Sequence, residues 1–236
     1  MSRTAFLIGG IFPYLAATVF LIGVVSRLRA WRRVPQPGLM TVYPTKGSGM
    51  AELAKEALFF PSLFRGDRTL WLLSWSFHVA LALALIGHLR VVTALLDRGL
   101  ATVGVSSSGI AAMSAIAGGG AGIVLLVTVM TLLARRLLVA RVREVSTPPD
   151  FLALLLLIAV ITTGNVMRFG GTHFGLAETR VWAVSLLTFS PVVPANPAFL
   201  LHAFFAELTI LYVAFSKLMH FGGFFFTVAL AKRSQP

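Results

Sequence analysis

The sequence predicts an all-α integral membrane protein, a single domain over residues 1–236 with five transmembrane helices. Hydrophobic residues make up 57% of the chain and its mean hydropathy is +0.88, whereas soluble domains are roughly 45–50% apolar. Apolar runs long enough to cross about 30 Å of hydrocarbon recur along the whole chain. These runs leave no room for a sizeable water-soluble domain.

Basic or proline-rich connections separate the five apolar runs. Pro13 lies within the first run, where it is expected to kink the helix without preventing a crossing. A basic segment without a small-residue cleavage site follows this run, which favours a retained helix over a signal peptide. The predicted spans cover about residues 4–26, 70–96, 110–134, 150–167 and 198–222, with 224–231 as a candidate extension of the last.

The 20 Lys and Arg residues are divided unequally between the two sides of the membrane. Fifteen fall in the first and third connections and near the C-terminus, and five fall on the other side. The positive-inside rule then places the N-terminus outside and the C-terminus in the cytoplasm, with the chain in the cell inner membrane. Because this topology accounts for the net charge of +12, no nucleic-acid partner is expected.

Three shorter segments have predicted roles. Residues 50–66 have apolar residues at helical spacing, which indicates either a helix on the membrane surface or an ordinary packed helix. The segment VWAVSLLTF is predicted to be an interfacial helix anchored by Trp182, and Trp71 and Trp75 are predicted to be interface anchors. The segment AIAGGGAG favours close helix contact, with approach of a flat cofactor as the alternative.

Four of the five histidines lie within predicted spans. His78 and His88 lie on the second span and His202 and His220 on the fifth, whereas His173 is expected outside the hydrocarbon. An imidazole within hydrocarbon must find a partner where the solvent offers none, so it indicates a functional site. The chain has no cysteine, which excludes disulfides and thiolate-held iron–sulfur clusters, so a bound electron carrier must use other ligands.

The depths of these histidines predict two pairs. The second and fifth spans cross in opposite directions, which pairs His78 with His220 toward the cytoplasm and His88 with His202 toward the outside. Each pair could supply both axial ligands of one haem iron, giving two stacked b haems. At ~1.5 Å per residue the offset is ~15 Å on the second span and ~27 Å on the fifth, where eighteen residues also put both histidines on one helix face. This mismatch requires tilted helices, tilted haems, or a His220 near the end of its helix.

Two other classes of function compete with haem ligation. The histidines could line a proton or metal pathway of a transporter or channel, or each could bond a neighbouring helix in a structural membrane anchor. The sequence shows neither the repeated halves nor the paired broken helices that favour a transporter. No acidic or cysteine cluster indicates a hydrolytic metal centre. Ligation of two haems is therefore the favoured interpretation.

The spacing of these histidines also carries a family resemblance. The segments SFHVALALALIGH and LHAFFAELTILYVAFSKLMH resemble the membrane cytochrome b (gamma) subunits of respiratory nitrate reductases, over nearly the whole chain. This resemblance implies five spans, an outside N-terminus and two b haems, with the four histidines at the matching positions. The segment GMAELAKEALFFPSLFRGDRTLWLLSWSFH is closer to relatives that serve heterodisulfide-reductase-like iron–sulfur subunits, above all the M subunits of sulfite-reduction-associated Dsr complexes.

The resemblance implies an electron-transfer subunit of an oxidoreductase complex in sulfur metabolism. A quinone, menaquinone or ubiquinone, would exchange electrons through two haem b with a cytoplasmic iron–sulfur subunit, beside further membrane and periplasmic subunits. The family's quinol site lies near the outer haem, which here indicates Gly87 and Arg90, although Arg90 could equally compensate a haem propionate. Glu207 is expected to pair with Arg168 or Arg90, with a proton relay as the alternative.

Overall fold

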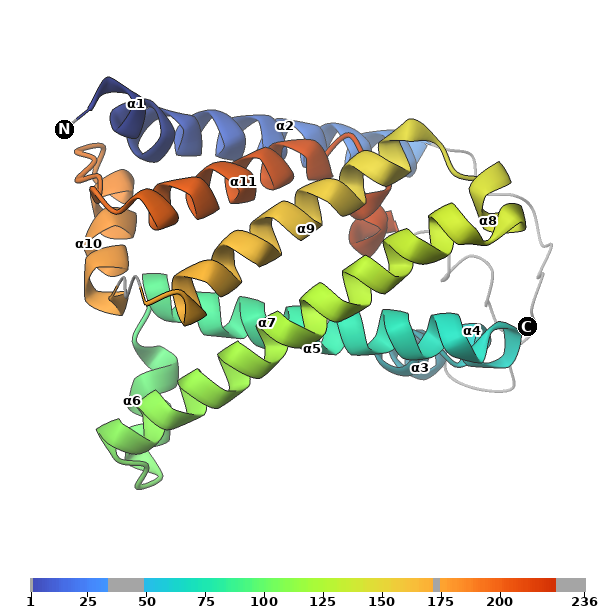
Figure 1. Ribbon diagram of the computed structural model, residues 1–236, viewed down its shortest axis with the longest axis horizontal. Helices are drawn as coiled ribbons and strands as arrows, with labels where there is room; N and C mark the ends of the chain where they lie inside the picture. Colours follow the sequence, from blue (N-terminus) through green and yellow to red (C-terminus); the bar gives the residue numbers. More distant parts are fainter. Residues whose placement is uncertain (1, 34–48, 172–174, 224–236) are drawn as a thin grey trace.

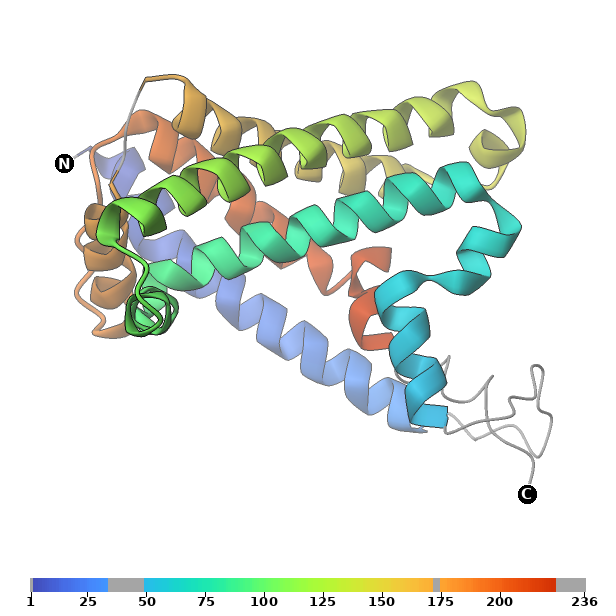
Figure 2. The same cartoon turned by 90° about the horizontal axis from the view of Figure 1, so that it is seen from below.

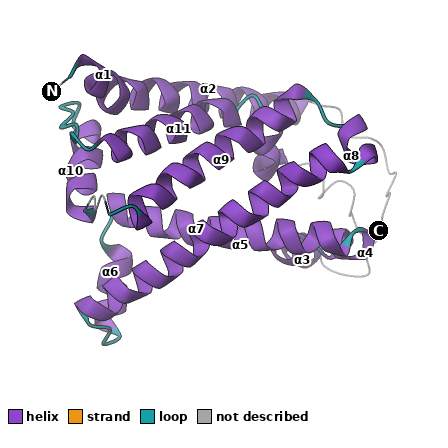
Figure 3. Ribbon diagram, viewed as in Figure 1, coloured by secondary structure: helices purple, strands orange, loops and turns teal. Residues whose placement is uncertain are grey.

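The computed structural model describes residues 2–33, 49–171 and 175–223, and every regular element in these ranges is helical (Figure 3). The all-α prediction is therefore confirmed for this part of the chain, and the candidate extension at 224–231 and His173 lie outside it. The elements in order are α1 (Arg3–Phe6), η1 (Leu7–Ile11), α2 (Phe12–Arg33), α3 (Gly49–Phe59), α4 (Pro61–Gly66), α5 (Arg68–Val92), α6 (Leu95–Thr102), α7 (Ser107–Leu138), α8 (Ala140–Glu144), α9 (Pro148–Phe169), α10 (Leu176–Leu187), α11 (Pro197–Val213) and η2 (Lys217–Met219).

The long helices α2, α5, α7, α9 and α11 run between two ends of the molecule (Figure 1). One end, here called the α10 end, holds α1, α6 and α10, and the other, the α8 end, holds α3, α4 and α8 (Figures 1 and 2). Helices α2, α7 and α11 run from the α10 end to the α8 end, and helices α5 and α9 run in the opposite direction (Figure 1). Spans five and two are thus antiparallel, as the pairing of their histidines requires.

In the described ranges, four helices are long and apolar enough to cross a membrane, and a bent pair makes a fifth candidate span if it is counted as one. The four are Arg3–Arg33, Arg68–Val92, Ser107–Leu138 and Pro148–Phe169. The bent pair is Pro197–Val213 with Lys217–Gly223, whose axes differ by 73°. By length and composition these are the helices of a multi-pass membrane protein, and the four coincide with the first four predicted spans, with shifted ends.

Pro13 leaves the first helix continuous because another side chain takes over its missing bond. A proline has no N–H to donate to the carbonyl four residues earlier, here that of Gly9. The Trp182 Nε1–H on α10 donates to this Gly9 oxygen at 2.7 Å, just where η1 widens the helix. The Tyr14 hydroxyl donates to the Leu186 oxygen at 2.8 Å. The predicted helix around Trp182 is thus present, and its tryptophan fastens it to the first span.

The second span is shorter than the predicted 70–96. Helix α5 runs from Arg68 to Val92, and the side chain of its N-cap Asp67 accepts from the Leu70 N–H at 2.9 Å. Thr93 is extended, with φ −145° and ψ 147°, and the chain then turns into α6. Hydropathy alone placed the end of the predicted span at residue 96, beyond this turn, because the residues on both sides of Thr93 are apolar.

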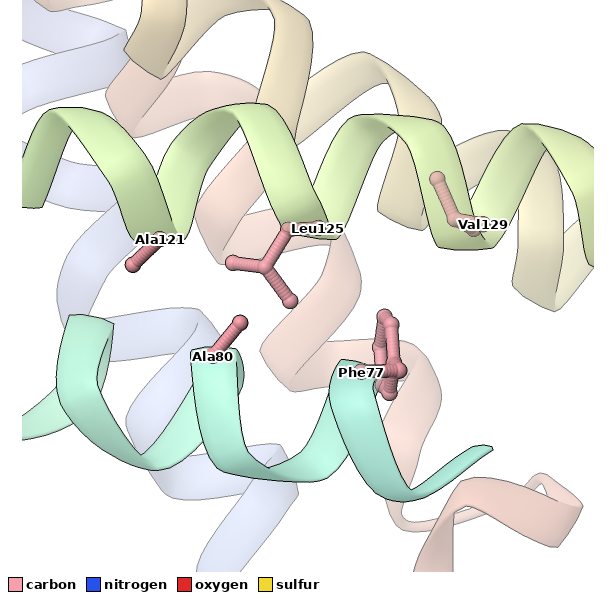
Figure 4. Close-up of a cluster of buried hydrophobic side chains, with 5 residues drawn as sticks. All are labelled: Phe77, Ala80, Ala121, Leu125 and Val129. Carbon is pink, nitrogen blue, oxygen red and sulfur yellow. The ribbon is translucent and has the colours of Figure 1, made fainter. Parts of the chain in front are cut away.

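The glycine-rich part of α7 is a helix-contact surface, as favoured above. A Cβ at Gly119 would lie 3.2 Å from the Phe169 ring, and the Asn165 Nδ2–H donates to the Gly122 oxygen at 3.0 Å. Small residues therefore let α9 approach the backbone of α7 closely. On its other side α7 packs against α5 through a buried apolar cluster of Phe77, Ala80, Ala121, Leu125 and Val129 (Figure 4).

The last span breaks between Val213 and Lys217. Ser216 caps the following turn by accepting from the Leu218 N–H at 3.2 Å. The Lys217 ammonium reaches the buried Asp150 carboxylate, the first-turn acid of α9, at 2.9 Å. The chain after α11 consequently turns away from the axis of that helix (Figure 2). The expectation that His202 and His220 share one helix face was wrong, because it assumed an unbroken helix.

Candidate haem-binding sites

The structure brings His88 and His202 together near the α10 end. His88 lies on α5 and His202 on α11, and their ring centroids are 6.2 Å apart with an interplanar angle of 30°. The ring of His202 also packs on α9, where a Cβ at Gly164 would lie 3.1 Å from its Cε1 atom. Its Nδ1 lies 3.1 Å from the Val160 oxygen and 3.3 Å from the Thr163 hydroxyl.

The structure brings His78 and His220 together near the α8 end. Their ring centroids are 5.8 Å apart, with the rings nearly perpendicular at 85°. His220 directly follows η2, so the break in the last span puts it beside His78. Two phenylalanine rings, of Phe60 and Phe77, meet His78 edge to face at 5.2 and 5.5 Å. Of the three ways to reconcile the offsets of the two spans, a His220 outside the straight part of its helix is the one observed.

All four imidazoles use the same ring nitrogen for a backbone contact. The Nδ1 atoms lie within 2.7–3.1 Å of the carbonyl oxygens of Ser74, Ala84, Val160 and Lys217. Because a carbonyl only accepts, Nδ1 carries the proton in each neutral ring. Each Nε2 is left with its lone pair, the arrangement usual for histidines that ligate a metal.

The spacing of each pair fits an iron held between two imidazoles. With metal–nitrogen bonds of about 2.0 Å on each side, the two ring centroids lie about 6 Å apart. The observed 5.8 and 6.2 Å fit this spacing. In the described ranges no three or more His, Cys, Asp or Glu side chains gather where they could hold a metal ion by themselves. Two ligands suffice for haem because the porphyrin supplies the other four.

Comparison with known proteins identifies the family of this chain. A family model described as nitrate reductase gamma subunit matches residues 61–234, which include all four histidines. The chain belongs to the nitrate reductase gamma subunit family. It is 30% identical over 270 residues to the Hdr-like menaquinol oxidoreductase cytochrome b-like subunit of Archaeoglobus fulgidus, covering 93% of this chain and 77% of that protein. The protein of the same name from Archaeoglobus profundus is 29% identical over 256 residues, covering 91% and 75%.

The family resemblance predicted from the sequence is confirmed at this level. The relatives are cytochrome b-like subunits of an oxidoreductase that acts on menaquinol, so an electron-transfer subunit of a multi-subunit complex is the coarse function that they support. Assignment to a Dsr complex is finer than these comparisons reach.

The residues predicted for quinone lie where the second span ends. A Cβ at Gly87 would meet no atom within 4 Å, so the α5 surface beside His88 is open there. Arg90 is already engaged, because its Nε–H donates to Asp97 at 2.7 Å. Arg180 on α10 donates to the same carboxylate at 3.1 Å and to the Arg90 oxygen at 2.7 Å. The Arg90 hydrogen bond, with the one from Arg180, holds the pKa of Asp97 below its usual value.

The predicted pairing of Glu207 with an arginine was wrong. Arg90 binds Asp97, and the Arg168 guanidinium donates to the Ser114 oxygen on α7. Neither oxygen of Glu207 has a hydrogen-bond partner among the described residues. The sequence shows a carboxyl and two arginines within the spans or at their ends, but it does not show that Arg90 meets Asp97 of α6 or that Arg168 meets α7.

Trp71 and Trp75 bond to backbone rather than only anchoring an interface. Their indole N–H groups donate to the last carbonyls of α3, those of Phe59 at 2.8 Å and Leu58 at 3.0 Å. These bonds fasten α3 and α4 against the start of α5. Phe60, between α3 and α4, adopts φ 49° and reaches the ring of His78. The predicted helical segment 50–66 therefore contacts the site at the α8 end.

Proposed function

We propose that this chain is a di-haem b subunit that transfers electrons between a menaquinone pool and a cytoplasmic iron–sulfur subunit of the heterodisulfide-reductase-like kind. The observation that carries the proposal is the placement of four membrane histidines in two pairs, each imidazole with a protonated Nδ1 and a free Nε2. The names of the Archaeoglobus relatives support menaquinol as the quinone substrate. Ubiquinone is the alternative.

In this proposal His78 and His220 hold one haem, and His88 and His202 hold the other. The bound haems supply one-electron carriers at two depths, which lie about 15 Å apart along the unbroken helix α5. The backbone carbonyls that accept from each Nδ1 fix the ring orientation and raise the basicity of Nε2. Because two imidazoles would hold each haem, quinone would bind beside a haem and not on its iron.

The α8 end faces the cytoplasm in this proposal, since the basic connections lie there. The iron–sulfur partner then docks at the α8 end and quinone binds at the α10 end, near Gly87 and Arg90. Arg180 and Asp97 hold the Arg90 side chain at this end. Further membrane and periplasmic subunits complete the complex, which we place in the inner membrane.

A Dsr-type sulfur-metabolism complex is the assembly that we favour for this subunit. The support is the segment from 49 to 78, which in the structure forms α3, α4 and the start of α5 around His78. A respiratory nitrate reductase is the alternative, since the family is named for its gamma subunit. Purification from native membranes and identification of the attached chains distinguish these assemblies: Dsr-type iron–sulfur subunits support the first and a nitrate-reducing subunit the second.

The proposal is tested by adding a reduced menaquinone analogue to the purified protein under anaerobic conditions. The expected result is reduction of b-type haem within the mixing time of a stopped-flow experiment. A His88→Ala and His220→Ala double variant, which removes one ligand from each pair, is the control, and its spectrum should show no b-type haem bands. Wild-type protein without haem, or with haem that the quinol never reduces, contradicts the proposal.

A further inference from the structure

Glu207 is a buried acid without a counterpart. Its exposed fraction is 5%, and its two carboxyl oxygens are the buried side-chain polar atoms that lack a hydrogen-bond partner in the described part of the chain. A buried carboxylate without a partner is strongly disfavoured in a low-dielectric setting, which tolerates the neutral acid far better. Such a group is retained at a cost, so a role that needs its proton is indicated.

The position of Glu207 is fixed by the seam between α2 and α11, which run in the same direction. Gly9 lies against Leu200, the Phe12 and Phe204 rings are 5.9 Å apart, and Gly23 lies against Ala214. This constant register puts Glu207 level with Ala16, whose exposed fraction is 2%. The carboxyl is thus enclosed between two membrane helices, about 7.5 Å along α11 from the ligand His202.

Among the described residues, no ionisable group on the elements packed around Glu207 neutralises it. On α9, Asp150 binds Lys217 of η2, and Arg168 binds a carbonyl of α7. On α11 itself, His202 faces α9, and the Tyr212 hydroxyl donates to the Pro149 oxygen. Element η1 carries no ionisable side chain, and those of α2 are Tyr14, which donates to α10, and the basic residues of its final turns, Arg27, Arg29, Arg32 and Arg33.

A cavity of about 480 Å³ lies on the same seam, toward the α8 end. It begins at Val19, one helical turn beyond Ala16, and reaches Ser26 and Arg27. Gly23 and Ala214 also line it, at the point where the last span breaks. The cavity therefore begins about one turn from the Glu207 level and extends to Ser26 and Arg27 at the basic end of α2, about three turns away.

We propose that Glu207 is a proton-uptake residue coupled to electron arrival at the haem held by His88 and His202, and that its proton passes through this cavity. The ferric iron takes one electron, supplied by quinol, and becomes ferrous, while the Glu207 carboxylate takes one proton from the α8 side and becomes the neutral acid. Reoxidation reverses both steps. Net charge within the membrane is unchanged in each cycle, which removes the electrostatic penalty of adding an electron alone. This inference rests on the proposed di-haem function.

The test is a redox titration of the purified haem-loaded protein at a series of pH values. In the wild type, the midpoint potential of the haem at the α10 end should fall as the pH rises. Glu207→Gln, which keeps the shape but cannot ionise, should remove most of this slope, and Glu207→Asp should restore it. Glu144→Gln, at an exposed acid of α8, is the matched control and should leave the slope unchanged.

An equal slope in wild type and Glu207→Gln overturns the inference while leaving the di-haem function intact. Colourless wild-type protein refutes the di-haem function itself. If the Gln variant does not retain haem, reduced-minus-oxidised infrared spectra of the wild type decide the matter. A protonated-carboxyl band that shifts or weakens in Glu207→Asp supports the inference. Absence of any protonated-carboxyl band from the wild-type spectra overturns it.

A separate variant tests whether the proton passes through the cavity. Ser26→Leu places a bulky apolar side chain in the cavity without touching a haem ligand. The equilibrium slope should stay as in the wild type, whereas re-equilibration of the haem potential after a pH jump should slow several-fold. Re-equilibration at the wild-type rate overturns this route.

Discussion

The two histidine pairs reach similar ring spacings with different architecture. His88 and His202 lie on unbroken helices, their rings differ by 30°, and α9 supports His202 through Val160 and Gly164. His78 and His220 have rings at 85°, and His220 follows a break in its helix. The α10 site is thus positioned by continuous helices, whereas the α8 site depends on a turn held by Asp150 and Lys217. Similar ring spacings, 5.8 and 6.2 Å, are therefore reached by packing at one site and by redirecting the chain at the other.

Removal of one histidine at a time tests the pairing and has the largest expected effect. His88→Ala and His202→Ala should each abolish the same haem, and His78→Ala and His220→Ala should each abolish the other, halving the haem content of the protein. The measurement is haem per chain, with low-temperature spectra to distinguish the two sites. Loss of different haems from the two members of one pair would refute the pairing.

A substitution of Asp150 tests whether the turn supports only the α8 site. Asp150→Ala removes the carboxylate that binds Lys217, together with its bond to the Thr147 N–H at the start of α9. Loss of a helix cap costs about 1–2 kcal/mol, so the thermal midpoint should fall, and the haem at His78 and His220 should be released first on heating. Lys217→Ala, which keeps the cap, should weaken that haem alone. Equal weakening of both haems by either variant would remove the distinction between the sites.

A glycine substitution should perturb the α10 site and leave the α8 site unchanged. Gly164→Ala puts a Cβ 3.1 Å from His202 Cε1, so the ring must move by a few tenths of an ångström. The expected result is a shifted absorption maximum or redox potential for the haem at His88 and His202 only. Gly120→Ala, where a Cβ meets nothing within 4 Å, is the matched control and should leave both spectra unchanged.

The smallest expected effect concerns the charged cluster at the α10 end. Hydrogen bonds from Arg90 and Arg180 hold the pKa of Asp97 below its ordinary value of 3.8. A depressed pKa in the folded state stabilises the protein above the unfolded value, and this contribution is lost as the pH falls through the folded value. Asp97→Asn should therefore lower stability by under about 1 kcal/mol at pH 7, because the groups are partly exposed. The difference from wild type should vanish well below pH 3.8, and a difference that persists there contradicts this cause.

Much of the fold followed from the sequence, because crossing a membrane imposes long apolar helices. Hydropathy located the four unbroken spans, and the antiparallel order of the spans that carry His88 and His202 indicated which histidines meet. The break after Val213 was not predictable, since the segment AFSKLMH holds neither glycine nor proline. It depends on a tertiary bond from Lys217 to Asp150, 67 residues away in the chain.

The polar partners inside the membrane were the least predictable part of the site. Glu207 was expected to meet an arginine, but Arg90 is taken by Asp97 on α6, and Arg168 turns to a carbonyl of α7. Trp182 was expected to mark an interface, and it replaces the bond that Pro13 cannot make. Residue type and depth are readable from a sequence, whereas the face that each side chain presents depends on how the helices rotate against one another.

Haem content of the purified wild-type protein tests the central claim most directly. The account predicts a red protein whose reduced-minus-oxidised spectrum shows b-type bands and whose pyridine haemochrome assay gives about two haems per chain. A folded protein that binds no haem, in cells supplied with haem precursors, would contradict it.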